Sequence, residues 1–180
     1  MKPEPKPSEI HRKALKQYYL GIAFFIIAVL VLVAILIIPD KQKTKPEAEA
    51  SYEFNPQGVV YFIDEKGKPF CEFSAEIAET PEKQLTGLMY RDSLAADQAM
   101  LFLMNRTEVQ NFWMKNTYLP LDIIFIGEDS TIVHIASNTT PFSEEQINSQ
   151  LPARYVVEVN AGIAAQKNIK PGCKFYWERK

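Results

Sequence analysis

The feature that most constrains this chain is an uninterrupted apolar stretch at residues 20–38, LGIAFFIIAVLVLVAILII. These 19 residues carry no charge, and a helix of that length spans about 28 Å, close to the roughly 30 Å hydrocarbon core of a bilayer. A helix of this length in a soluble core would normally have a polar stripe, and none is present. The stretch therefore predicts one transmembrane helix, with the lipid bilayer as its partner.

Charges on the two sides of this stretch predict its orientation. Residues 1–19 contain five Lys and Arg, whereas three Lys follow within 39–51. Because the more positive side normally stays in the cytoplasm, residues 1–19 are expected to form a basic cytoplasmic segment, with the rest of the chain extracytoplasmic or periplasmic. A cleaved signal peptide is the competing interpretation, because Ala48-Glu49-Ala50 has the small-x-small form of a cleavage site. The apolar stretch is longer than the usual 7–15 residue signal core, which favours an uncleaved signal-anchor.

The remainder of the chain divides by composition into a linker and a domain. Residues 39–51 hold two prolines and alternating charges, which is typical of an extended linker. Residues 52–180 are enough for one globular domain. From residue 51 onward the chain holds 12 Lys and Arg against 17 Asp and Glu, a net charge of −5. Such an acidic domain argues against nucleic acid as a partner, because neutralising phosphates requires a basic surface.

Short β-branched and aromatic runs alternate with turn residues along the domain. Thr80-Pro81 marks a helix start, with Thr as the N-cap and Pro in the first turn. The pattern predicts an α+β domain, compact and mainly antiparallel, with a partly closed β-barrel-like sheet and two or three short helices. Strands are expected at 59–63, 70–78, 99–104, 112–114, 121–126, 131–136, 155–159 and 173–177, and helices at 80–91, 143–146 and 160–168.

Several separated blocks between residues 70 and 180 resemble, in order, the family called domain of unknown function 192. They are Glu76-Ile77-Ala78-Glu79-Thr80, Gly87-Leu88-Met89-Tyr90-Arg91, Met100-Leu101-Phe102, Phe112-Trp113-Met114-Lys115-Asn116-Thr117, Pro120-Leu121-Asp122, Glu158-x-x-Ala161-Gly162 and Pro171-Gly172. The chain departs from the family pattern at Ala99, where a Gly is usual, and at Cys173, where an Asp is frequent. The resemblance implies a fold and leaves the activity open, so this is an uncharacterised protein whose residues must be interpreted directly.

Charged and polar residues within these blocks form the candidate ligand-binding set: Glu76, Arg91, Trp113, Lys115, Asn116 and Asp122. One interpretation is structural, with Asn116 capping a turn and Asp122 accepting backbone N–H bonds or pairing with a cation. The other is a small polar pocket, in which the indole of Trp113 could stack on a sugar ring or a cation. Because a buried carboxylate needs a partner, we expect Arg91 or Lys115 to neutralise Glu76 or Asp122.

Three functions remain open. The first is a membrane-tethered extracytoplasmic binding or interaction module for a small polar ligand or an envelope protein. The second is an envelope-associated hydrolase or transferase that uses Asp122 and Glu76. The third is a structural accessory protein. Because the known catalytic motifs for serine hydrolases, zinc proteases and P-loop enzymes are missing from the sequence, the first is favoured over enzyme activity.

The two cysteines and two histidines make a metal site doubtful, and we expect neither a metal nor a cofactor. Cys71 lies in an early strand and Cys173 at the start of the last one, so a disulfide across about 100 residues is possible. The alternative, two free thiols packed as small apolar groups, is favoured.

Overall fold

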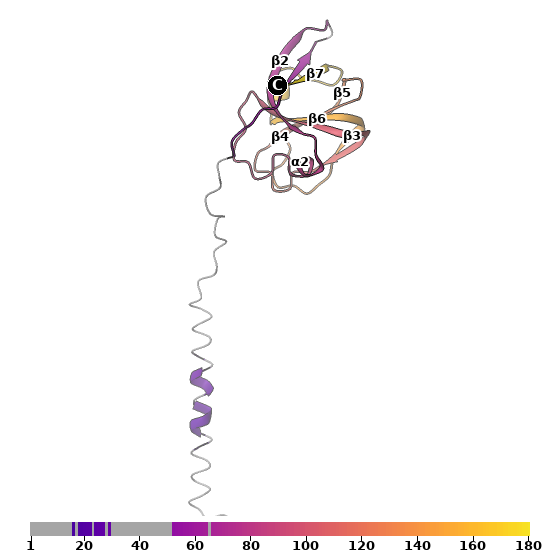
Figure 1. The fold of residues 1–180 in the computed structure, drawn as a ribbon. Coiled ribbons are helices and arrows are strands. Elements are labelled where there is room, and N and C mark those ends of the chain that lie inside the picture. Colours follow the sequence, from indigo (N-terminus) through magenta and orange to yellow (C-terminus); the bar gives the residue numbers. More distant parts are fainter. Residues whose placement is uncertain (1–15, 17, 23, 28, 30–51, 65) are drawn as a thin grey trace, which may run out of the picture. The chain divides into compact units, whose positions relative to one another are not determined.

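The computed structural model describes residues 16, 18–22, 24–27, 29, 52–64 and 66–180 (Figure 1). The chain divides into two units, Met1–Ser51 and Tyr52–Lys180. The described residues of the first unit are helical. Residues 1–15, the second half of the expected transmembrane span 20–38 and the predicted linker 39–51 lie outside the described residues. Over the described part of the chain, every helix falls short of the length and apolarity needed to cross a bilayer.

The second unit is built from one sheet and two short helices. Its strands and helices are β1 (Gly58–Ile63), β2 (Pro69–Ala78), α2 (Pro81–Thr86), β3 (Gln98–Phe112), β4 (Leu121–Ile126), β5 (Ile132–Ala136), β6 (Ile147–Asn160), α3 (Ile163–Gln166) and β7 (Lys174–Arg179). The strand order is β5-β4-β6-β3-β2-β1-β7, and each neighbouring pair is antiparallel except β2 with β3.

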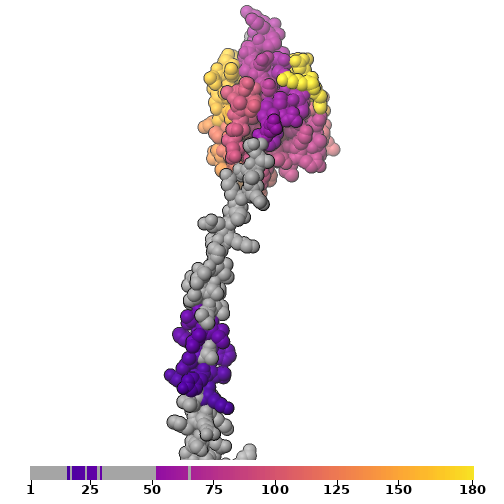
Figure 2. All heavy atoms as spheres, turned by 60° about the vertical axis from the view of Figure 1, so that its left-hand side comes forward, coloured from indigo at the N-terminus to yellow at the C-terminus, as the bar shows by residue number. Residues whose placement is uncertain are grey.

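The sheet curls until its two edge strands touch. Thr131, just before β5, forms a bridge with Lys174 of β7, and the Ile132 N–H donates to the Cys173 carbonyl at 2.9 Å. These contacts protect part of both edges, which an open sheet would leave unpaired. The C-terminal residues, yellow in Figure 2, lie at the domain surface because β7 pairs only with β1 along its length. The predicted α+β fold with a partly closed, mainly antiparallel barrel is thus confirmed.

The parallel pairing of β2 with β3 determines the path of the segment between these two strands. Parallel neighbours cannot be joined by a hairpin and need a crossover. The chain from Ala78 to Gln98, which contains α2, provides it. This crossover packs on one side of the sheet, which we call the crossover face. Its core includes Leu88, Met100 and Phe125. The opposite side, the barrel face, encloses the larger core around Phe62, Phe73 and Phe175.

Several element boundaries differ from the sequence predictions. The residues predicted as separate strands at 99–104 and 112–114 belong largely to one 15-residue strand, β3, which ends at Phe112. The helix predicted at 80–91 ends at Thr86, because Gly87 has a φ of +47° and caps it. The predicted helical turn at 143–146 is wrong, since Ser143 Oγ accepts the Glu145 N–H in a tight turn instead.

Cys71 is buried and Cys173 half-buried, and both are free thiols. The favoured prediction of two unpaired cysteines is confirmed. Burial raises the pKa of the Cys71 thiol, which keeps it protonated at neutral pH.

Candidate functional site

Two glutamates share one row of residues across the sheet. Glu76 of β2 pairs with Met100 of β3, and Met100 pairs with Glu158 of β6. Residues directly opposite in neighbouring strands point to the same face, so all three side chains lie on the crossover face. Neighbouring strands lie about 4.8 Å apart, which places the two glutamate backbones roughly 10 Å from each other.

Arg91 reaches this row from the crossover. Its Nη1 lies 2.6 Å from Oε2 of Glu76, and the two residues are 6% and 4% exposed. The guanidinium is brought there because the chain turns sharply after α2, at Gly87, and the Arg91 N–H bonds the Leu88 carbonyl. The expectation that Arg91 neutralises Glu76 is confirmed.

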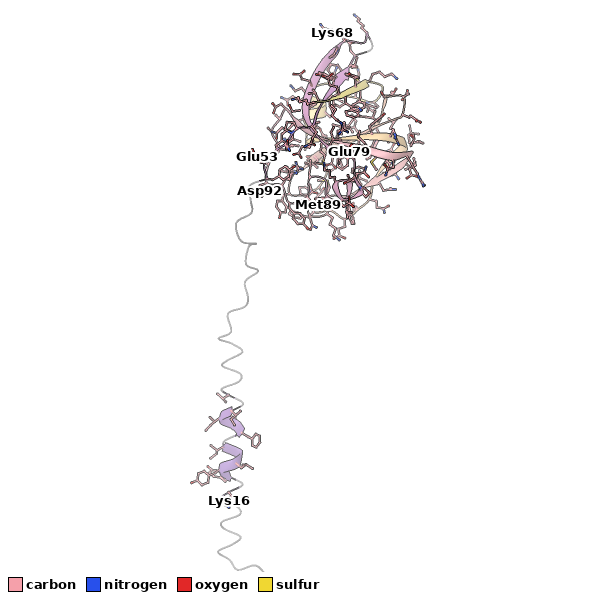
Figure 3. The ribbon with its side chains drawn as sticks, viewed as in Figure 1. Lys16, Glu53, Lys68, Glu79, Met89 and Asp92 are labelled. Atoms are coloured by element: carbon pink, nitrogen blue, oxygen red, sulfur yellow. The ribbon has the colours of Figure 1, made fainter. Side chains whose placement is uncertain are left out.

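The first residues of the domain form a strap over this ion pair, comprising residues 52–57. The Tyr52 hydroxyl and the Asn55 N–H both donate to Oε1 of Glu76. The Arg91 guanidinium lies over the Tyr52 ring, 3.6 Å from its centre. Burial and the bond to Glu76 raise the pKa of Tyr52 to about 12. Figure 3 labels Glu53 and Asp92, the residues that follow Tyr52 and Arg91 in the chain.

Glu158 is buried in the same row but lacks a comparable partner. It is 5% exposed, and the described residues give its carboxyl neither a hydrogen bond nor an ion pair within 4.0 Å. Its Oε2 lies beneath Gly87, 3.9 Å from where a Cβ on that glycine would be. Burial raises the pKa of Glu158 to about 8, although the more distant charge of Arg91 acts in the opposite direction.

A cavity of about 430 Å³ opens beside these groups. Its walls come from the strap, from β2 and β3 and from α2 with its capping glycine. The lining residues are Tyr52, Asn55, Gln57, Glu76, Ile77, Ala78, Glu82, Lys83, Thr86, Gly87, Arg91 and Met100. A volume of this size is within the range of small-molecule sites, and the mixture of apolar wall and few charges is typical of them.

Asp122, in contrast, lies on the other side of the sheet. It pairs with Val159, which is next to Glu158, and a shift of one residue along a strand reverses the face. Its side chain is 0% exposed, and its two oxygens accept the N–H groups of Asn138 and Ala164, each at 2.9 Å. The structure therefore does not bring Asp122 and Glu76 together, which corrects the expectation that they act as a pair.

The remaining candidates, Trp113, Lys115 and Asn116, lie in the turn after β3 and do not line the cavity at Glu76. The Lys115 ammonium pairs with Glu144 at 3.6 Å and lies 5.1 Å from the Trp113 ring centre. Asn116, at a φ of +55°, donates to the Tyr90 hydroxyl at 2.7 Å. Trp113 lines a separate hollow of about 300 Å³ with Phe112. These three side chains support the turn and its surroundings, so one convergent pocket of all six candidates does not form.

Glu158 and Tyr52 belong to the site but were not among the candidates. Glu158 was visible as the first residue of the Glu158-x-x-Ala161-Gly162 block, and its interruption of the apolar run Val156-Val157-Glu158-Val159 is a signal of a buried charge. Tyr52 carries no local signal, since only the tertiary fold brings it to Arg91. Among residues 52–64 and 66–180, no cluster of three or more His, Cys, Asp or Glu is arranged to hold a metal ion.

Comparisons with solved structures give two close likenesses. A protein of unknown function from Novosphingobium aromaticivorans DSM 12444 is 39% identical, with a TM-score of 0.63, over 66% of this chain and 84% of that one. A protein from Sinorhizobium meliloti 1021, described as a "putative transcription regulator", is 38% identical, with a TM-score of 0.65, over 70% of this chain and 98% of that one.

No curated protein matches the chain. The family DUF192, described as "Uncharacterized ACR", matches residues 62–177. That range includes Glu76, Arg91 and Glu158, and it covers most of the domain. The chain therefore belongs to the DUF192 family.

Proposed function

We propose that this protein is a membrane-tethered, extracytoplasmic module whose domain binds a small polar ligand at the cavity beside Glu76 and Arg91. One observation carries the proposal: a nearly buried ion pair, 2.6 Å apart, forms part of the wall of a cavity of about 430 Å³. Burying two charges costs free energy that apolar residues of similar volume would not require. Placing that pair at a cavity is consistent with selection for binding rather than for stability.

Binding explains the geometry better than turnover does. Oε1 of Glu76 accepts hydrogen bonds from Tyr52 and Asn55, and Oε2 is ion-paired with Arg91 at 2.6 Å although it accepts no hydrogen bond from the described residues. A general base or nucleophile needs a free lone pair directed at the substrate. The second carboxylate of the hydrolase hypothesis, Asp122, lies on the barrel face and has both oxygens bonded to backbone N–H groups. A purely structural role leaves the cavity beside Arg91 without an explanation.

The tether rests on residues 20–38 and their flanks. We expect intact spheroplasts to lose the domain on addition of protease, while a cytosolic marker survives. Full protection of the domain would contradict the extracytoplasmic location. Release of the whole protein by carbonate washing would contradict the anchor.

Nucleic acid is not the ligand that we propose. From residue 51 onward the chain has a net charge of −5, and the cavity itself contains as many acidic as basic lining side chains. The description of the Sinorhizobium meliloti protein as a regulator is therefore not transferred to this chain.

Ligand binding is tested on the full chain in detergent micelles by thermal unfolding with a fixed probe set. The set comprises two amines (putrescine and agmatine), two neutral sugars (glucose and N-acetylglucosamine) and two carboxylates (acetate and citrate). We expect at least one class to raise Tm by about 2 °C or more at millimolar concentration, because a ligand that binds only the folded state stabilises it.

Neighbouring positions on α2 offer a matched pair of variants. Thr86 lines the cavity and Leu85 lines the separate hollow near Trp113, and both are exposed. Thr86→Trp should abolish the shift by filling the cavity, whereas Leu85→Trp should retain it. The proposal is overturned if every probe leaves Tm unchanged, or if the shift survives Thr86→Trp.

A further inference from the structure

We infer that the cavity selects a small organic cation, a primary amine, and that Glu158 is the group that receives its charge. This inference rests on the proposed binding function and names its ligand class. Its basis is geometric: two buried carboxyl groups, Glu76 and Glu158, flank Met100 on one face, and among the described residues the guanidinium of Arg91 is the one that pairs with either of them.

The first step is the count of charges. Arg91 compensates Glu76 directly, at 2.6 Å, and is more than 4.0 Å from the Glu158 carboxyl. The cavity walls add one further acid, Glu82, and one further base, Lys83, both on α2 and exposed. With all of these groups and Glu158 ionised, three carboxylates face two cations. One bound cation therefore completes the balance once Glu158 is ionised, whereas a bound anion would not restore it.

The second step is access to Glu158. Gly87 separates its carboxyl from the cavity and has no side chain to close the gap. At a φ of +47°, and with Phe102 3.2 Å from the position of a would-be Cβ, a larger residue at this position would be strained. Glu158 is not itself a lining residue, and Gly87 thus places no side chain between its carboxyl and the cavity. Met100, which also lines the cavity, offers apolar surface for the carbon part of the amine.

The third step is the proton. The titratable groups that line the adjacent cavity are Arg91 from the crossover, Glu76 from β2, Glu82 and Lys83 from α2 and Tyr52 from the strap, while the neighbour of Glu158 on β4 is the apolar Ile123. Burial outweighs Arg91 and raises the pKa of Glu158 to about 8, so the carboxyl is mostly protonated at pH 7. An arriving ammonium forms an ion pair with the carboxylate and one proton leaves to solvent, so charge and atoms balance.

Calorimetric titration of the full chain in micelles with putrescine, agmatine and methylammonium tests this inference. In the wild type, the apparent affinity should rise about tenfold per pH unit from pH 6 to about 8 and then level off, because ionised Glu158 is the binding form. At pH 7, titrations in buffers of different ionisation enthalpy should show close to one proton released per amine bound.

Glu158→Gln should lose at least tenfold in amine affinity at pH 8 and should lose the pH dependence. This variant resembles the protonated carboxyl in shape and is expected to fold, which its unfolding transition would verify. Glu145→Gln, an exposed glutamate outside the site, is the matched control and should bind as the wild type does.

The inference is overturned if the amines bind Glu158→Gln as well as they bind the wild type, or if binding releases no proton. It is equally overturned if only the neutral or carboxylate probes bind; in that case the binding function stands and the ligand class is wrong. Failure of every probe class overturns the proposed function itself, so the two failures are distinguishable.

Discussion

Asp122 and Glu158 are buried carboxyl groups on neighbouring strands, β4 and β6, and they have opposite environments. Asp122 is 0% exposed and receives two backbone N–H bonds at 2.9 Å. Glu158 is 5% exposed and receives none from the described residues, and burial raises its pKa to about 8. Burial alone therefore does not tell whether a carboxyl group is satisfied by its surroundings. The donors around the carboxyl decide this, because they determine whether its charged form is already stabilised.

The two carboxyl groups also differ in what they contribute to the fold. Asp122 joins the loop at Asn138 to the start of α3 at Ala164, so it holds two distant segments together. Glu158 lies under the crossover, where the guanidinium of Arg91 is already paired with Glu76. A chain could replace Glu158 by an apolar residue and pack the row more easily, which suggests that stability is not the reason for its presence.

The largest expected effect is that of Asp122→Ala. It leaves two buried N–H groups without acceptors, and each unsatisfied group costs about 1–3 kcal/mol, so we expect a loss of about 4 kcal/mol in the free energy of unfolding. Urea unfolding measures it, with the exposed Asp97→Ala as the control. A loss of less than about 1 kcal/mol would mean that these bonds do not make Asp122 structural.

Arg91→Met should have the next largest effect. It removes the cation from a buried pair and leaves Glu76 with only the Tyr52 and Asn55 donors, so we expect a loss of about 3 kcal/mol, at the lower end of values for broken buried pairs. The double variant Arg91→Met/Glu76→Gln should recover part of the loss. Equal stability of the single and double variants would show that the pair is not coupled. The exposed Arg106→Met serves as control.

Glu158 should give stability a pH dependence. Its pKa is about 8 when folded and about 4.3 in an unfolded chain, so between these values the folded protein binds more protons than the unfolded one. Its contribution to stability is therefore complete below pH 4 and is lost as pH rises to about 8, at up to about 1.4 kcal/mol per unit.

The measurement is the difference between wild type and Glu158→Gln in urea unfolding from pH 5 to 9. Relative to the wild type, Glu158→Gln should gain stability as pH rises. Asp122→Asn should be less stable than the wild type at every pH. A wild-type curve parallel to that of Glu158→Gln would show that Glu158 has an ordinary pKa and would make the two acids alike.

The smallest effect is expected for Tyr52→Phe. It removes one hydroxyl from Glu76 and leaves the ring against Arg91, so the free energy of unfolding should fall by about 1 kcal/mol. Tyr118→Phe is the matched control, because Tyr118 is half-buried and its hydroxyl has no hydrogen bond among the described residues. In a spectroscopic titration, the tyrosine with a pKa of about 12 should disappear in Tyr52→Phe and remain in the control.

Local patterns predicted most of the fold. The run Leu121-Asp122-Ile123-Ile124-Phe125-Ile126 is a strand with the predicted bounds, and Thr80 caps α2 as its hydroxyl and the following proline indicate. The prediction was poorest where a strand passes through polar residues. Asn105 to Gln110 of β3 lack a strand pattern, and within them Glu108 and Val109 pair with Ala153 and Pro152 of β6, which come from far along the chain.

The sequence alone determined the family, through its motifs, and most of the strands, through their β-branched runs. It also predicted that buried carboxyl groups would need partners, because charged residues stand within those motifs. Each of these signals can be seen in a short stretch of the chain. Only the tertiary structure decided which acid joins which base. Glu76 and Asp122 share neither a strand nor a turn, and the pairing register puts them on opposite faces, since one residue of offset reverses a side chain. The same register aligns Glu76, Met100 and Glu158, and the crossover required by the single parallel pair carries Arg91 onto them.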